Sequence, residues 1–96
     1  MESKSKVLMA PLGPGWAEIP AELLVGVSED LEAIDAARRL AESLERTNCL
    51  FIQGSPDEIP WRDSFFDVVY TSGKSTAEIR RVIKPEGRIQ ECLSGY

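Results

Sequence analysis

Histidine is absent from the 96-residue chain, and only two cysteines occur in it, Cys49 and Cys92. Catalytic groups of the Ser/His/Asp and Cys/His types both need a histidine, so neither type is available. Two cysteines without histidine are also too few for a disulfide framework or a Cys/His metal site. We therefore expect no metal, and we interpret both cysteines as small buried hydrophobic residues.

The chain also lacks long apolar runs and an excess of positive charge. No segment is long and apolar enough to cross a bilayer, and residues 1–6, MESKSK, lack the apolar core of a signal peptide. We expect these six residues to form a flexible polar tail on a cytoplasmic protein. Eleven Lys and Arg against sixteen Asp and Glu give a net charge of −5, which repels nucleic acid and anionic membranes. We expect neither as a partner.

The composition that remains is that of one folded domain over residues 1–96, with 43% hydrophobic and 28% charged residues. Short apolar runs rich in Val, Ile, Leu and Phe alternate with helical stretches. This alternation predicts an α/β fold of three layers around a mostly parallel five-stranded sheet. The expected strands are residues 7–10, 23–27, 50–53, 66–71 and 88–93.

Two helices are predicted between these strands. The first covers residues 29–46, with Ser28 as its N-cap and Asn48 in a left-handed conformation that ends it. Its apolar positions share one helical face. They are Leu31, Ile34, Ala37, Leu40, Ala41 and Leu44. The second helix covers residues 75–84, because Ser75 and Glu78 have capping-box spacing and Pro85 disfavours helix before it.

Four segments carry a family resemblance through their order. They are residues 26–38 (GVSEDLEAIDAAR), 51–61 (FIQGSPDEIPW), 63–70 (DSFFDVVY) and 78–89 (EIRRVIKPEGRI). In this order they resemble the second strand and helix, the third strand and its adenine-facing loop, the fourth strand, and the turn before the fifth strand of class I S-adenosylmethionine-dependent methyltransferases. The resemblance implies a Rossmann-like methyltransferase fold that is truncated after the fifth strand.

The same resemblance implies an S-adenosylmethionine site at the carboxyl ends of the strands. The family's glycine-rich turn follows the first strand, and its ribose-binding acid falls on Ser28, with Glu29 or Asp30 as substitutes. Thr71 ends the fourth strand, and we interpret it either as a ligand contact or as a polar loop residue. The implied cofactor-binding residues are Gly13, Gly15, Ser28, Glu29, Ser55, Pro56 and Thr71. Catalytic residues are not indicated.

The chain departs from the family at several of these positions. Met9 stands in place of the acid that ends the first strand. Pro11 replaces a glycine, and its φ is fixed and its nitrogen carries no proton. Only residues 16–24 separate the turn from the next strand, which is too short for a full crossover helix with an N-terminus facing the ligand. The sequence therefore indicates a reduced cofactor site.

Two functions follow from this pattern. The first is a methyltransferase-like binding or assembly scaffold without catalysis, which forms a homodimer through the edge of the fifth strand. The second is an active small methyltransferase with atypical contacts to S-adenosylmethionine, in which catalysis rests mainly on positioning. The reduced site favours the scaffold.

Other motifs have simpler explanations. The glycine pair Gly13 and Gly15 begins a dinucleotide fingerprint, but Glu18 occupies the third glycine position. The acidic pairs at residues 57–58 and at 63 and 67 fit the spacing of an acid and a base, but solvation or capping explains them better. Trp16 and Trp61 are interpreted as packing residues, with stacking on adenine as the alternative.

Overall fold

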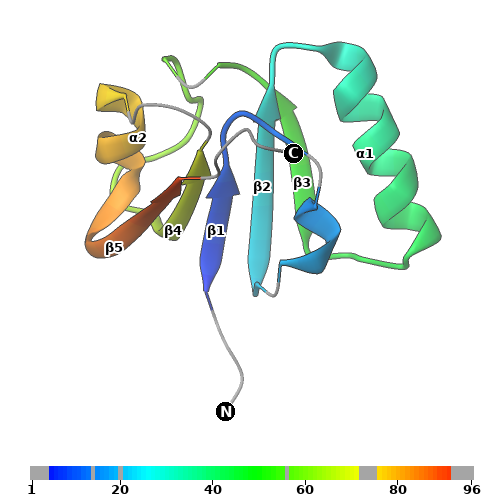
Figure 1. Cartoon of the computed structure of the whole chain (residues 1–96), viewed down its shortest axis with the longest axis horizontal. Helices are drawn as coiled ribbons and strands as arrows, with labels where there is room; N and C mark the ends of the chain where they lie inside the picture. The colour runs from blue at the N-terminus through cyan, green and yellow to red at the C-terminus, as the bar shows by residue number, and fades with distance from the viewer. Residues whose placement is uncertain (1–4, 14, 20, 56, 72–75, 92–96) are drawn as a thin grey trace.

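Five parallel strands form one sheet in the computed structural model, which describes residues 5–13, 15–19, 21–55, 57–71 and 76–91 (Figure 1). The strand order is β3-β2-β1-β4-β5, and each neighbouring pair is parallel. The predicted α/β class and parallel sheet are confirmed. The elements are β1 (Lys6–Met9), the 3-10 helix η1 (Trp16–Glu18), β2 (Leu23–Ser28), α1 (Leu31–Ser43), β3 (Cys49–Gln53), β4 (Phe66–Thr71), α2 (Ala77–Val82) and β5 (Ile83–Glu91).

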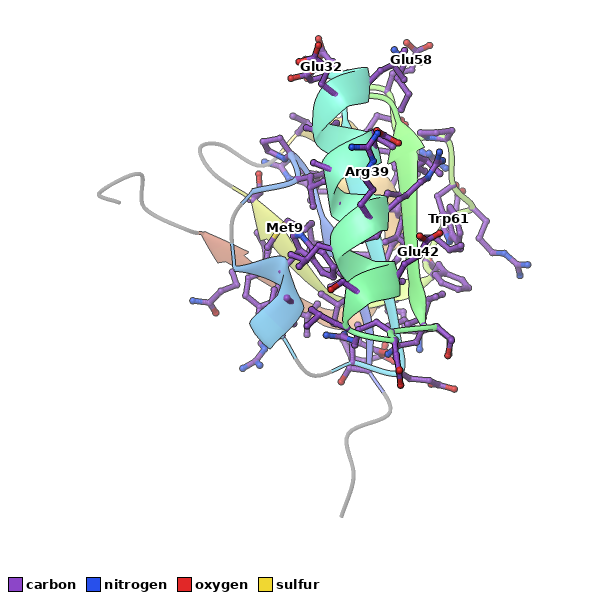
Figure 2. All side chains as sticks on the ribbon, turned by 90° about the vertical axis from the view of Figure 1, so that its right-hand side faces the viewer. Met9, Glu32, Arg39, Glu42, Glu58 and Trp61 are labelled. Atoms are coloured by element: carbon purple, nitrogen blue, oxygen red, sulfur yellow. The ribbon has the colours of Figure 1, made fainter. Side chains whose placement is uncertain are left out.

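The two faces of the sheet are covered by different elements. Side chains alternate between the faces along β1, so Val7 and Met9 belong to one core cluster and Leu8 to the other. The first cluster includes Trp16 of η1 and Ile34 of α1. The second contains Ile59 from the β3–β4 connection and three side chains that α2 and β4 supply, namely Ile79, Val82 and Phe66. In Figure 2, which looks onto α1, Trp61 lies on the far side of β3 from this helix.

The first helix is shorter than predicted, because β2 extends through Ser28. Ser28 pairs with Gln53 in the sheet, so it cannot also cap the helix. Its Oγ accepts a hydrogen bond from the Asp30 N–H at 3.1 Å. The N-cap is Asp30, whose side chain accepts from the Glu32 N–H at 3.0 Å. The prediction of Ser28 as N-cap is wrong.

The C-terminal end and the buried face of α1 also differ from expectation. The residue in the left-handed conformation is Glu45, with φ of 58°, and Asn48 instead donates from Nδ2 to the Ala21 carbonyl at 2.7 Å. Only Ile34, Ala37 and Ala41 are buried. The three leucines of the predicted stripe are exposed: Leu31 at 61%, Leu40 at 44% and Leu44 at 48%. The helix therefore packs on the sheet through a narrow stripe of mostly small residues.

The second helix runs directly into the last strand. Its N-cap is Thr76, whose side chain accepts from the Ile79 N–H at 3.1 Å; Ser75, the predicted cap, lies outside the described residues. The strand begins at Ile83 rather than at residue 88, so helix and strand meet without the predicted turn. Residues 92 and 93, the end of the predicted strand, lie outside the described residues.

A bulge explains the early start of β5. Phe66 pairs with Ile83 and Val68 pairs with Arg88, so two steps along β4 correspond to five along β5. The bulge needs a glycine, because a Cβ at Gly87 would lie 2.8 Å from the Asp67 carbonyl oxygen. The residues that the sequence analysis assigned to a turn therefore belong to an irregular edge strand.

Of the residues predicted to form the tail, Lys6 belongs to the sheet and Ser5 is bonded to the segment before β2. The Ser5 carbonyl accepts a hydrogen bond from the Glu22 N–H at 2.8 Å. Lys6 begins β1, and its N–H donates to Asp67 Oδ2 at 2.9 Å. Residues 1–4 lie outside the described residues. Among the helices that the structure describes, none is long and apolar enough to span a membrane.

The outer edge of β3 is occupied by a side chain of α1. Arg38 Nη2 donates to the Phe51 carbonyl oxygen at 2.9 Å. Strands β3 and β5 stand at the two ends of the strand order, so each pairs on one side only within the described sheet. Arg38 thus satisfies a backbone acceptor that an added strand would otherwise bind.

Candidate functional site

The carboxyl ends of β1, β2 and β3 meet at one rim of the sheet, as parallel strands require. Two backbone hydrogen bonds join the segments that follow β1 and β3 to the last two residues of β2. The Leu12 N–H donates to the Val27 carbonyl at 2.7 Å, and the Gly54 N–H donates to the Ser28 carbonyl at 2.9 Å. The segments that follow β1 and β3 are therefore both held against the end of β2 at this rim.

The loop after β1 is packed down onto β2. A Cβ at Gly26 would lie 2.8 Å from Leu12 Cδ1 and 2.9 Å from Phe51 Cδ1, so the Leu12 side chain fills the space above this glycine. Trp16 is 5% exposed, and its ring meets that of Phe51 edge-on with centroids 4.8 Å apart. The loop is thus part of the hydrophobic core on the α1 face.

The two predicted glycines of this loop do not line the open pocket that holds other predicted residues. Gly13 lines a small apolar hollow of about 330 Å³ between the loop and α1, together with Leu12, Trp16 and Leu40. Gly15 has a φ of 86° and precedes η1. We therefore assign both glycines a role in the backbone conformation of the loop.

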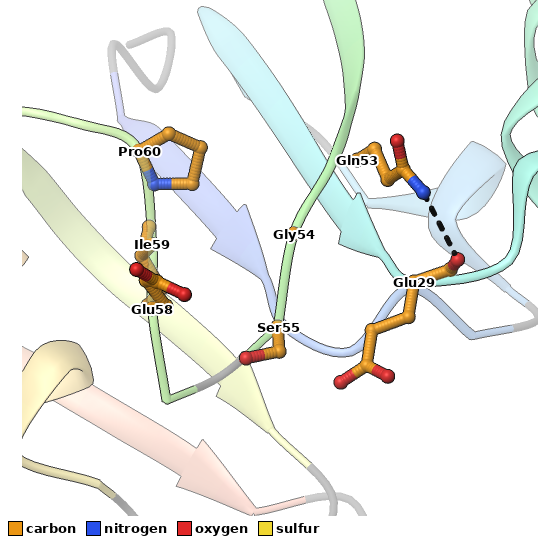
Figure 3. A pocket seen from close by; sticks show the side chains of 7 residues that line it. All are labelled: Glu29, Gln53, Gly54, Ser55, Glu58, Ile59 and Pro60. Carbon is orange, nitrogen blue, oxygen red and sulfur yellow. Dashed lines mark hydrogen bonds between the residues drawn. The ribbon is translucent and has the colours of Figure 1, made fainter.

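An open pocket of about 780 Å³ lies between the ends of β2 and β3 and the β3–β4 connection (Figure 3). Its lining residues are Glu29, Gln53, Gly54, Ser55, Glu58, Ile59 and Pro60. Two of these, Glu29 and Ser55, are among the predicted site residues. Pro56, which was also predicted, lies outside the described residues. The other five were missed, although the resemblance of residues 51–61 to an adenine-facing loop pointed to this segment.

A tight turn shapes the floor of the pocket. Ser55 and Glu58 form an antiparallel bridge, and the Glu58 N–H donates to the Ser55 carbonyl at 3.0 Å. The Ser55 hydroxyl accepts from the Asp57 N–H at 3.2 Å. A Cβ at Gly54 would lie 3.1 Å from Pro60 Cδ, so a larger residue would push the wall outward. The glycine thus sets how closely the wall approaches β3.

The polar groups of the pocket are mainly acceptors. Glu29 and Glu58 are exposed, and Figure 3 shows both side chains on the side of the pocket where Ser55 lies. Gln53 Nε2 donates weakly to the Glu29 carbonyl at 3.5 Å. Two carboxylates suit a ligand with hydroxyl donors and repel a phosphate.

Thr71 and the end of β1 occupy the point where the strand order reverses, between β1 and β4. Thr71 is 2% exposed and Ala10 is fully buried. The Ala10 N–H donates to the Tyr70 carbonyl at 3.0 Å. Ligands of open α/β sheets usually bind at this reversal, but the open pocket here lies to one side of it, over β2 and β3. Thr71 does not line that pocket.

The acidic side chains outside the pocket have structural partners. The backbone N–H of Lys6 lowers the pKa of the Asp67 carboxyl; burial opposes this shift, and Lys84, whose Nζ lies 3.0 Å from Asp67 Oδ1, adds to it. Asp63 forms an ion pair with Arg81. The acid–base interpretation of these two residues is not supported.

A third carboxylate, Glu78, contacts the pocket wall. Its Oε1 accepts from the Ile59 N–H at 3.0 Å, and its Oε2 accepts from Arg81 Nε at 2.9 Å. The hydrogen bonds from Arg81, and then from Ile59, lower the pKa of Glu78. The residue is therefore held in its charged form against the pocket wall.

The remaining aromatic and sulfur side chains have packing roles. Trp61 packs against Phe65 and Phe66, with ring centroids 5.4 and 5.7 Å away. Neither Trp16 nor Trp61 lines the open pocket, which favours packing over stacking on adenine. Cys49 is half-buried, and burial raises the pKa of its thiol. Cys92 lies outside the described residues.

No protein-family model matches the sequence, and no curated protein is significantly similar to it. Solved structures are similar. The YcgJ protein of Bacillus subtilis superposes with a TM-score of 0.78 at 22% identity, over 92% of this chain and 43% of that chain. A putative methyltransferase of Bacillus halodurans gives 0.75 at 19% identity, over 93% and 44%. The [4+2]-cyclase SpnF gives 0.74 at 19% identity, over 88% and 37%.

These comparisons agree with the strand order and with the segment resemblance noted in the sequence. The chain spans less than half the length of each of the three structures. At identities this low, the superpositions establish a shared architecture only, because one fold can host several chemistries. The chain has a partial Rossmann-like methyltransferase fold, with a five-stranded parallel sheet as its core.

Proposed function

We propose that this chain is a methyltransferase-fold binding scaffold that retains part of the cofactor site and does not transfer a methyl group. The retained part is the open pocket at the ends of β2 and β3. The lost part is the loop after β1, whose residues are used to cover β2. We expect the protein to act in the cytoplasm.

The single observation that carries this proposal is the position of Leu12. Its N–H is bonded to the Val27 carbonyl at 2.7 Å, and its side chain covers Gly26. A ligand that uses the glycine turn would need the backbone of this loop, but the backbone is tied to β2 and the leucine fills the space above it. Displacing Leu12 would expose Phe51 and Gly26 and lose part of the core.

For the pocket we propose a ligand of the adenosyl type, either S-adenosylmethionine or its demethylated product. Glu29 and Glu58 offer carboxylate acceptors for ribose hydroxyls, and Pro60 offers an apolar surface. The volume of about 780 Å³ is in the range of small-ligand pockets. The two carboxylates disfavour phosphorylated nucleotides.

The test is a pair of titrations followed by backbone amide signals. Adenosine and S-adenosylhomocysteine should both shift the amides of Gly54, Ser55 and Glu58. Their dissociation constants should agree within about threefold, because the amino-acid half makes little contact. The signals of Gly13 and Gly15 should not move. If neither ligand shifts any backbone amide signal at about 1 mM, an adenosyl ligand is ruled out.

An active methyltransferase is the second candidate, favoured by the presence of Glu29 and Ser55 in one open pocket. It predicts that S-adenosylhomocysteine shifts Gly13 and Gly15 together with Ser28 and Ser55. It also predicts binding of this ligand at least about tenfold tighter than that of adenosine. Either result would replace the scaffold proposal.

For the assembly role we propose a homodimer that forms through the outer edge of β5. Arg38 occupies an acceptor on the edge of β3, whereas β5 offers a nine-residue edge. Ile89→Lys should abolish the dimer in sedimentation experiments. Leu50→Lys, which places the same charge on the β3 edge, should leave it intact. A monomer at all accessible concentrations, or a dimer that survives Ile89→Lys, contradicts this arrangement.

A further inference from the structure

The wall of the open pocket belongs to an irregular segment. Glu58, Ile59 and Pro60 come from the connection between β3 and β4. The described part of this connection contains one isolated bridge, between Ser55 and Glu58. A wall of this kind gets its shape from the contacts that hold it, because no ladder of backbone hydrogen bonds fixes it.

Both backbone polar groups of Ile59 are bound by one ion pair on α2. The Ile59 N–H donates to Glu78 Oε1 at 3.0 Å, and the Ile59 carbonyl accepts from Arg81 Nη2 at 2.8 Å. Glu78 and Arg81 bond each other as well, with Arg81 Nη2 at 2.9 Å from Glu78 Oε1. Two bonds in opposite directions fix the rotation of the chain at Ile59 as well as its position.

The same helix holds the distal part of the connection. Arg81 pairs with Asp63, and the carbonyl of Arg81 accepts from the Ser64 N–H at 2.9 Å. The carbonyl of Val82 accepts from the Phe65 N–H at 2.7 Å. Helix α2 therefore holds the connection by hydrogen bonds and an ion pair from Ile59 to the start of β4.

The neighbours of Ile59 make this anchoring relevant to a ligand. The Ile59 side chain is 2% exposed in the core, whereas Glu58 and Pro60 on either side of it are exposed and line the pocket. The rotation of the chain at Ile59 therefore sets the direction in which the Glu58 side chain leaves the backbone. Side-chain exposures of 27% for Glu78 and 32% for Arg81 show that the pair is partly shielded from water, which strengthens its hydrogen bonds.

We propose that Glu78 and Arg81 are positioning residues of the pocket, which hold the Ile59 peptide groups and so fix the ligand-facing orientation of Glu58 and Pro60. This inference rests on the proposed function, because it concerns the same pocket. It adds an element of the site that lies on the opposite side of the connection from the ligand.

Amide hydrogen exchange tests the anchoring without any ligand. In Glu78→Ala the Ile59 amide should exchange about tenfold faster or more, because its charged acceptor is lost. In Glu78→Gln, which keeps an oxygen acceptor, the increase should be smaller. The amide of Leu24, which donates to the Asn48 carbonyl at 2.9 Å in the sheet, should not change in either variant. Equal acceleration at Ile59 and Leu24, or none at Ile59, would overturn the proposal.

Ligand affinity then shows whether holding the Ile59 peptide groups also matters for ligand binding. In Arg81→Met the dissociation constant of S-adenosylhomocysteine should rise about tenfold. Arg39→Met is the matched control, because Arg39 forms one exposed ion pair with Asp35 at 2.9 Å on α1. Its affinity should equal that of the wild type. A loosened Ile59 amide with unchanged affinity would overturn the positioning role.

Failure of the proposed function gives a different pattern. If the wild-type chain does not bind S-adenosylhomocysteine or adenosine, the adenosyl ligand is wrong. The exchange comparison between Glu78→Ala and Glu78→Gln then still decides whether this pair holds the pocket wall.

Discussion

Leu12 is bonded through its N–H to the carbonyl of Val27, and its side chain covers Gly26, the residue that precedes Val27 in β2. The loop after β1 is thus held on the C-terminal half of β2 by a backbone hydrogen bond and by close side-chain packing. Glycine at position 26 is a condition for this fit, because any Cβ there would overlap Leu12 and Phe51. This contact between Leu12 and β2 is the feature that most distinguishes the loop after β1 from a loop whose backbone is free to bind a ligand.

Gly26→Ala should therefore destabilise the protein. The added methyl would force Leu12 and Phe51 apart, at a cost of about 1 to 3 kcal/mol. Gly13→Ala is the matched control, since nothing lies within 4 Å of a Cβ at Gly13. Its effect should be below about 0.5 kcal/mol. Urea denaturation measures both, and equal stability of the two variants would show that Leu12 does not fill this space.

Gly87→Ala should disturb the bulge of β5 by a different route. The new Cβ would lie 2.8 Å from the backbone carbonyl of Asp67 and 2.7 Å from Ile83 Cγ1. A backbone atom cannot move aside as readily as a side chain, so we expect the free energy of unfolding to fall by about 2 kcal/mol or more. Amide signals of Arg88 and Val68 should shift, because their pairing follows the bulge. Unchanged thermal unfolding would contradict the bulge geometry.

Two leucine truncations test which face of α1 and β2 is buried. Leu24→Ala should cost about 2 to 5 kcal/mol, because Leu24 is fully buried on the α1 face of β2. Leu40→Ala should cost less than about 1 kcal/mol, because this side chain is 44% exposed. Comparable losses in chemical denaturation would mean that Leu40 is covered in solution.

Stability should fall in acid through two carboxylates with lowered pKa values. Lys6, through its backbone N–H, and Lys84 lower the pKa of Asp67, and Arg81 and Ile59 lower that of Glu78. A group whose pKa is lower in the folded state stabilises it above the unfolded pKa, and this contribution disappears as the pH falls through the folded pKa. These groups titrate at 3.8 and 4.5 when unperturbed. We therefore expect the loss of folding stability to begin at about pH 5 and to continue below about pH 4.

Asp67→Asn provides the check on this pH dependence. The variant should be less stable than the wild type at pH 7, and the difference should narrow as the pH is lowered toward about 3. Urea midpoints across this range measure the effect. A difference that stays constant with pH would show that the charge of Asp67 does not contribute.

The sequence predicts the first four strands well because each is a separate, largely apolar run of four to six residues, whereas β5 is a longer and mostly polar strand. It predicts the start of α1 less well, since Ser28 and Asp30 are both good N-caps. The choice depends on how far β2 remains paired with β3, and Ser28 still pairs with Gln53. That pairing is a tertiary contact with no local signature.

The site is predictable only in part for a similar reason. Glu29 and Ser55 follow strands, so the rule that ligands bind at carboxyl ends finds them. Ile59 and Pro60 belong to a segment without periodicity, whose position depends on bonds to Glu78 and Arg81 some twenty residues later. Pro85 and Gly87 suggest a turn, but a bulged edge strand tolerates both residues.

The hydrogen bond from Arg38 to the Phe51 carbonyl has a consequence for self-association. A sheet with two receptive edges can stack end to end without limit and grow into fibres. Here Arg38 occupies one backbone acceptor on the β3 edge, which makes that edge less suited to pair with a further strand than the β5 edge. In the homodimer proposed above, pairing of β5 with β5 about a twofold axis would close after two copies and would not lead to an open-ended polymer.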